Sequence, residues 1–103
     1  CAWVLQIKGY SIVAQRSRQP GSEVDLIAQR QGVLGFVEVK ARASTRDAIE
    51  SISLRQQSRI IRAAESFVAN NAHFADRTLR FDVMLVAAWR WPVHIPNAWH
   101  ILA

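Results

Sequence analysis

The dipeptide Gln31-Gly32 separates two strand-like segments, 23–29 and 33–40, and the second is rich in β-branched and aromatic residues. Glycine supplies the backbone freedom that a tight turn requires, and two residues are the commonest loop length between antiparallel strands. The segment 23–40 is therefore predicted to form a β-hairpin. This hairpin constrains the fold most strongly, because it also determines which charged side chains face each other.

The predicted register brings charged residues together. With a two-residue loop, Asp25 lies opposite Glu38, and Glu23 lies opposite Lys40. Side chains alternate between the two faces of a strand, so Glu38 and Lys40 share one face, and the neighbouring valines point to the other. Two acids and a lysine are thus expected to converge.

Charged side chains within the apolar run 33–39 cost free energy unless they are paired or bind a metal. In one interpretation, Asp25 and Glu38 bind Mg²⁺ with a backbone carbonyl, waters and a phosphate oxygen, and Lys40 positions a water or stabilises charge on phosphorus. In a second, Glu23 pairs with Lys40 in an unreactive cross-strand ladder. In a third, the acids are partners of nearby arginines. The residues alone leave these alternatives open.

Caps, glycines and apolar periodicity predict the remaining elements. Ser53 and Gln56 have the spacing of a capping box, and Asn70 and Asn71 mark the end of that helix. The other expected elements are a helix at 2–8 ended by Gly9, a strand at 10–15, a loop at 16–22, a central strand at 79–88, a short edge strand at 93–95 and a final helical turn capped by Asn97. Residues 41–52 are polar and are left unassigned.

The length of 103 residues fits one domain, 1–103, with one core. No apolar stretch approaches the roughly 20 residues of a membrane span, and a single cysteine suits a reducing compartment, so a cytoplasmic protein is expected. Trp3, Val4 and Ile7 follow helical spacing from the first residues onward. We therefore expect the N-terminal helix to be truncated.

The formal net charge of +5, with 11 arginines among 13 basic residues, indicates an anionic partner, with nucleic acid favoured. Arg55, Arg59 and Arg62 have the spacing of one helical stripe, which suits a DNA backbone better than a purely solvated face. The predicted nucleic-acid contacts are Arg16, Arg18, Arg42, Arg55, Arg59 and Arg62.

Other conspicuous residues are given structural roles. Trp89 and Trp91 flank Arg90 and could stack on bases or form a dimer patch, but packing at the end of a core strand is favoured. The three histidines lack metal-ligand spacing. Asp82 is expected to be structural.

Three ordered motifs resemble those of the YraN-like family: Gly-Ser-Glu23-Val-Asp25-Leu-Ile-Ala, Phe-Val-Glu38-Val-Lys40-Ala-Arg and Arg80-Phe-Asp82-Val. The likeness continues in Gly-Tyr at 9–10, in Gln57 and Arg59, and in His-Ile-Pro-Asn-Ala at 94–98. This family is similar to Holliday junction resolvases within the restriction-endonuclease-like superfamily, whose motif is Asp, spacer, Glu-x-Lys. The chain departs from the family pattern at Arg16, Ser22 and Gln56, the last standing where a lysine is expected.

The resemblance implies an α/β fold with a restriction-endonuclease-like mixed central β-sheet flanked by helices. It also implies a Mg²⁺-dependent DNA endonuclease, with Mn²⁺ as a substitute, acting on branched or damaged DNA, with a homodimer expected for double-strand cutting. Asp25, Glu38 and the Val39 backbone carbonyl would bind the metal, Lys40 would be catalytic, and Glu23 and Gln57 would be accessory. The alternative is a non-catalytic DNA-binding or scaffold protein that retains the fold.

Overall fold

The computed structural model describes residues 1–15 and 24–100. Its β-sheet has five strands in the order β1-β2-β3-β4-β5. The elements are α1 (Ala2–Ile7), β1 (Ser11–Gln15), β2 (Leu26–Arg30), β3 (Val33–Ala41), α2 (Thr45–Glu50), α3 (Leu54–Asn70), the 3₁₀ helix η1 (Ala72–Phe74), β4 (Thr78–Val86) and β5 (Val93–Trp99). The strand β3 pairs parallel with β4, whereas the other neighbouring strands are antiparallel. This mixed sheet, flanked by helices, confirms the predicted fold class and is consistent with a restriction-endonuclease-like fold.

The predicted hairpin is confirmed in its turn and its register. Gln31 and Gly32 have φ values of 49° and 78°, as in the primed turns that join antiparallel strands. Arg30 pairs with Val33, and Leu26 pairs with Val37. Continued by one residue, this register places Asp25 opposite Glu38, as predicted.

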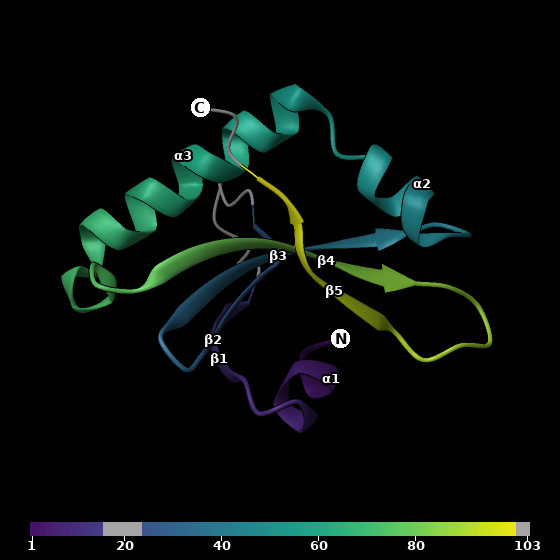
Figure 1. Cartoon of the computed structure of the whole chain (residues 1–103), viewed down its shortest axis with the longest axis horizontal. Helices are drawn as coiled ribbons and strands as arrows, with labels where there is room; N and C mark the ends of the chain where they lie inside the picture. The colour runs from purple at the N-terminus through teal and green to yellow at the C-terminus, as the bar shows by residue number, and fades with distance from the viewer. Residues whose placement is uncertain (16–23, 101–103) are drawn as a thin grey trace.

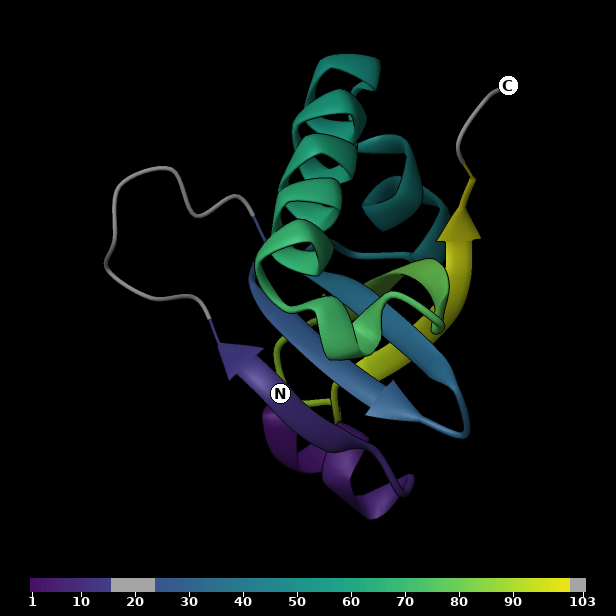
Figure 2. The same ribbon diagram turned by 90° about the vertical axis from the view of Figure 1, so that its left-hand side faces the viewer.

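The helices cover opposite faces of the sheet (Figure 1). On one face, Ile60 and Ala64 of α3 pack with Leu34 and Phe36 of β3 in the larger core cluster. On the other face, Leu5 of α1 packs in a smaller cluster with strand residues of the same sheet. Figure 2 shows α1 lying beside β1 and α3 crossing the opposite side of the sheet. The two core clusters therefore follow the alternation of side chains along the strands.

The connection from β3 to β4 positions the site. Parallel strands need a long crossover, and here α2 and α3 provide it. The segment that the sequence left unassigned contains α2, which begins after an N-cap in which the Ser44 side chain accepts from the backbone N–H of Asp47. Because β3 and β4 run in the same direction, their carboxyl ends lie at one edge of the sheet (Figure 1).

Within the described ranges 1–15 and 24–100, no helix is long and apolar enough to cross a membrane.

The C-terminal prediction is wrong. The edge strand continues to Trp99, so Asn97 caps no helical turn. The register of β5 against β4 shifts between Phe81 and Val83, and Asn97 has a φ of 53° at this irregularity. Its backbone N–H donates to Asp82 Oδ1 at 2.9 Å. A distant carboxylate thus replaces the ladder partner of Asn97 and allows the strand to continue beyond Pro96.

The packing prediction for Trp89 and Trp91 is also wrong, because both side chains are exposed. The strand β4 ends at Val86, before these residues. The buried tryptophan is Trp99, whose ring stacks on Phe81 with centroids 4.3 Å apart.

Candidate active site

Strand alternation places Glu38 and Lys40 on the α3 face of β3. Leu34 and Phe36 share this face and pack in the α3 cluster, whereas Val37 belongs to the α1 cluster. Glu38 is 5% exposed, and Lys40 is half-buried at the carboxyl end of the strand. The predicted shared face of Glu38 and Lys40 is therefore confirmed.

Gln56, in the first turn of α3, joins the two charged residues. Its Nε2 donates to Glu38 Oε2 at 3.3 Å, and its Oε1 accepts from Lys40 Nζ at 3.2 Å. One amide thus satisfies an acid and a lysine at the same time, because an amide offers both donors and an acceptor. Gln56 therefore contacts both site residues, although the sequence analysis did not assign it to the site.

The capping pattern gives a partial signal for Gln56. The Ser53 hydroxyl accepts from the backbone N–H of Gln56 at 3.1 Å, which confirms Ser53 as the N-cap. In a full capping box the third side chain returns to the cap residue, but the Gln56 amide turns towards β3 instead. The capping pattern in the sequence therefore locates the start of the helix but does not show where the Gln56 side chain points.

Asp25 approaches β3 from the end of β2. Its Oδ2 accepts from the backbone N–H of Val39 at 2.9 Å. The β2–β3 ladder ends at Leu26 and Val37, so the Asp25 carboxylate takes the place of a strand carbonyl two residues further along β3. This contact fixes an acid beside the residue that lies between Glu38 and Lys40.

The backbone of Val39 also presents an acceptor in this direction. The N–H and C=O of one strand residue point to the same side of the strand, so the Val39 carbonyl faces the side of β3 where Asp25 lies. Asp25 and Val39 both line a pocket of about 420 Å³, together with Gln15, Leu26, Cys1 and Ala2. Val39 therefore borders the same pocket as Asp25. This pocket lies on the α1 side of the sheet, because Cys1, Ala2, Leu26 and Val39 pack in the α1 cluster, whereas Glu38 and Lys40 lie on the α3 face.

The predicted arginine stripe lies on α3. Arg55, Arg59 and Arg62 are exposed, and at roughly 100° per residue they point away from the buried Ile60 and Ala64. The stripe thus faces solvent beside the turn that carries Gln56.

Two other predicted residues have local contacts. Arg42 is exposed directly after β3, and its Nη1 donates to the Ala41 carbonyl at 2.8 Å. The Gln57 amide donates to the Ile52 carbonyl at 3.3 Å, across the turn that precedes α3. Arg16, Arg18 and Glu23 lie outside the described residues.

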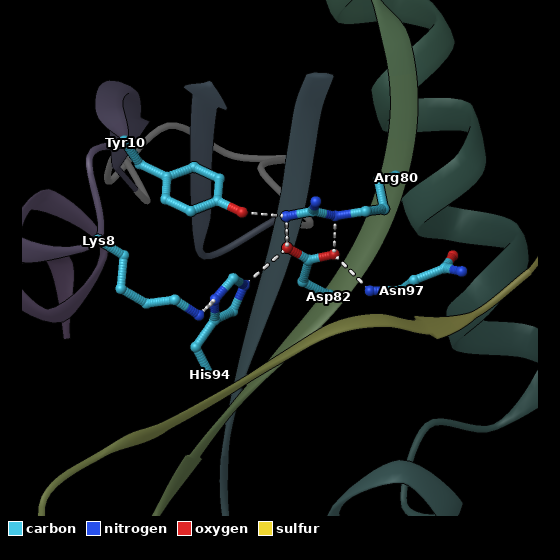
Figure 3. A network of polar contacts seen from close by, with 6 residues as sticks. All are labelled: Lys8, Tyr10, Arg80, Asp82, His94 and Asn97. Atoms are coloured by element: carbon cyan, nitrogen blue, oxygen red, sulfur yellow. Dashed lines mark hydrogen bonds and ion pairs between the residues drawn. The ribbon is translucent and has the colours of Figure 1, made fainter. Parts of the chain in front are cut away.

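A second polar cluster lies on the α1 face and centres on Asp82 (Figure 3). Its Oδ1 accepts from Arg80 Nε at 2.8 Å, and its Oδ2 contacts Arg80 Nη2 and His94 Nε2, each at 2.8 Å. Tyr10 Oη lies 2.6 Å from Arg80 Nη2. His94 Nδ1 lies 2.5 Å from Lys8 Nζ; because an ammonium only donates, Nδ1 accepts and Nε2–H donates to Asp82.

The ionisation of Asp82 is stabilised in spite of its burial. Burial opposes the charged form, but hydrogen bonds from His94, Arg80 and the Asn97 backbone outweigh it and hold the pKa of the Asp82 carboxyl below its ordinary value. The hydrogen bond between Arg80 and Asp82 also raises the pKa of the Arg80 guanidinium. This cluster joins the connection between α1 and β1 to β4 and β5, which fits the structural role predicted for Asp82.

The fold defines a small α/β protein with a mixed sheet, in which Glu38 and Lys40 lie near the end of β3 and Asp25 contacts the Val39 backbone between them. The chain matches the model of a family described as "Uncharacterised protein family UPF0102" over residues 1–86. It belongs to this family, and the YraN-like resemblance predicted from its motifs is confirmed at that level.

Relatives in this family are similar over most of the chain. A UPF0102 protein from Parvibaculum lavamentivorans is 46% identical over 96 residues, which cover 93% of this chain and 72% of that protein. One from Rhodopseudomonas palustris (strain BisB5) is 50% identical over 94 residues, covering 91% and 72%. The UPF0102 protein mlr4633 of Mesorhizobium japonicum is 43% identical over 99 residues, covering 96% and 79%.

Proposed function

We propose that this domain is a metal-dependent endonuclease that hydrolyses DNA phosphodiester bonds at the carboxyl end of β3. The observation that carries the proposal is the pair Glu38 and Lys40 held on one amide, next to the strand position to which Asp25 is bound. Asp25 and Glu38 would supply oxygen ligands, and Lys40 a positive charge, at this end of the strand.

The donor set fits Mg²⁺. Asp25, Glu38 and the Val39 carbonyl would hold the ion, all through oxygen, and Mg²⁺ sites often use only one or two carboxylates, with waters and substrate phosphates completing the shell. Within residues 1–15 and 24–100 there is no cluster of three or more His, Cys, Asp or Glu side chains, so the described part supplies two acids. Bound there, the ion would act as a Lewis acid towards the phosphate and would lower the pKa of a bound water.

Lys40 would handle charge and orientation. Its ammonium has three donors, so it can keep the contact to Gln56 while it donates to the attacking water or to a phosphate oxygen. Negative charge increases on the phosphate oxygens during attack, and a cation held in place stabilises it without reorganisation. Gln56 acts as a positioning residue, because it fixes Lys40 relative to Glu38.

The charge of the chain supports DNA as the substrate. The formal net charge is +5, and the exposed arginine stripe of α3 runs from the same helical turn as Gln56. Arginine suits phosphate oxygens through its planar fork of donors. Arg42, exposed directly after the site strand, extends the basic surface to β3.

One observation favours the alternative, a DNA-binding or scaffold protein without catalysis. Glu38 is 5% exposed, and its Oε2 accepts a hydrogen bond from the Gln56 amide. A closed Glu38–Gln56–Lys40 group would serve stability alone, and DNA would bind through the arginines.

The test is a cleavage assay on plasmid, linear duplex and four-way-junction DNA in Mg²⁺ and in Mn²⁺. We expect cleavage by the wild type that stops in EDTA and in Asp25→Ala, Glu38→Gln and Lys40→Ala. Glu65→Gln is the matched control, since Glu65 is an exposed acid of α3. Salt-sensitive DNA binding that neither EDTA nor Glu38→Gln alters, with all three substrates intact, would favour the alternative.

A further inference from the structure

The loop between β4 and β5 presents two tryptophans to solvent. Trp89 is 102% exposed and Trp91 is 74% exposed, the former as open as in an isolated chain. Exposed indoles lose the free energy that burial would provide, and each buries roughly 150–250 Å² when it finds a partner. Their exposure therefore indicates a surface that contacts something outside the described fold.

The loop lies at the same end of the sheet as the candidate site. Lys40 pairs with Leu85, and Ala41 pairs with Val86, the last residue of β4. The loop therefore begins two residues after the partner of Lys40. Arg90 Nη2 donates to the Ala43 carbonyl at 3.2 Å, which attaches the loop to the segment after β3. Both strands end at the edge from which this loop departs (Figure 1).

The two tryptophans differ in how the loop constrains them. Trp89 has a φ of 65°, a left-handed conformation in which a bulky residue is strained and glycine is favoured. Trp91 packs edge-on against Trp3 of α1, with ring centroids 4.9 Å apart, so one face is supported and the side chain still stays largely open. A turn built only to connect strands would not require an indole at the strained position.

The charges around the loop suit a polyanion. Arg90 lies between the two tryptophans, and Lys8 follows the helix that carries Trp3. The segments that supply this surface, 1–15 and 83–100, contain no Asp or Glu. An aromatic surface whose own segments carry only basic charges is complementary to nucleic acid, whose bases stack and whose phosphates are negative.

We infer that Trp89 and Trp91 stack on unpaired bases of DNA, so that the substrate carries a single-stranded or opened region next to the scissile bond. This inference rests on the proposed function and specifies its substrate class. A second copy of the chain is the weaker occupant, because two indoles provide roughly 300–500 Å² where a stable dimer buries about 800 Å² on each partner.

The experiment measures binding without cleavage, in EDTA, by fluorescence anisotropy of a labelled duplex with a short single-stranded gap and of the same duplex fully paired. The variants are Trp89→Leu with Trp91→Leu, which keeps apolar bulk without the ring, and Trp89→Phe with Trp91→Phe, which keeps a ring. Leu54→Ala is the control, because Leu54 is an exposed apolar residue on a different element, α3. Thermal melting verifies that each variant folds.

We expect the leucine variant to bind gapped DNA about tenfold more weakly or worse, with paired-duplex affinity changed by less than about twofold. The phenylalanine variant should retain most of the gap preference. Equal affinity of wild type and leucine variant for gapped DNA, or equal weakening on both DNAs, would overturn the inference while leaving the proposed function standing. If wild type binds neither DNA, both fail. Conversion of a dimer to a monomer in the leucine variant, with gap binding intact, would assign the surface to a second copy.

Discussion

The carboxylate of Asp25 accepts a hydrogen bond of 2.9 Å from the backbone N–H of Val39, one residue beyond Glu38. This contact extends the β2–β3 pairing by a side chain after the backbone ladder has ended. Asp25 is thereby held at the end of β3 by a backbone group of the strand itself. The proposed metal site follows from this relationship.

Asp25→Asn separates the structural from the catalytic role of this residue. The asparagine Oδ1 still accepts from Val39, so the free energy of unfolding should change by less than about 1 kcal/mol. Cleavage should fall by roughly two orders of magnitude or more, because a neutral amide is a poor Mg²⁺ ligand. Chemical denaturation and single-turnover cleavage measure the two effects. A large loss of stability with cleavage intact would assign Asp25 to the fold only.

Gln56→Ala removes both contacts of the bridging amide. We expect a loss of about 1–2 kcal/mol in the free energy of unfolding, and a fall of about tenfold in kcat with KM nearly unchanged, because the lysine is no longer oriented. Gln6→Ala, an exposed glutamine of α1, is the control. A rise in KM with kcat unaltered would contradict the positioning role of Gln56.

The arginine stripe is tested by salt dependence. Replacing Arg55, Arg59 and Arg62 by Gln should reduce the slope of log affinity against log salt by up to about three, since each phosphate contact contributes roughly 0.9 on duplex DNA. Arg30→Gln is the control: it changes an exposed arginine next to the hairpin turn and should leave the slope unchanged. An unaltered slope in the triple variant would remove the stripe from the DNA surface.

Asp82→Asn tests the structural cluster. Arg80 and His94 lose a buried charged partner, so unfolding free energy at neutral pH should fall by about 3 kcal/mol. The pKa of Asp82 is lowered in the folded state, so its stabilisation is fully present above the ordinary carboxyl pKa of about 4 and is lost as the pH falls through the folded value. The difference between wild type and variant should therefore shrink in acid. A pH-independent difference would contradict this origin.

Local signals predicted the part of the site that local geometry controls. The turn residues Gln31 and Gly32 set the hairpin register, and strand alternation then placed Glu38 and Lys40 on one face. Ser53 also located the start of α3, because a helix cap involves only residues that are neighbours in the sequence. These predictions required no knowledge of distant contacts.

The remaining features depend on contacts between distant segments. Asn97 was expected to cap a helix, but Asp82, 15 residues away, binds its N–H and keeps the strand extended. Gln56 meets Glu38 across 18 residues, a contact that a capping pattern does not contain. The exposure of Trp89 was missed because the apolar run continued beyond the true end of β4 at Val86.

The most direct test of the metal site is a crystal structure grown with Mn²⁺, with the ion located by its anomalous signal. The account predicts a peak in contact with the carboxylates of Asp25 and Glu38 and the carbonyl of Val39, lost in Asp25→Ala. Crystals at saturating Mn²⁺ with no peak there, and with Gln56 still bridging Glu38 and Lys40, would contradict it.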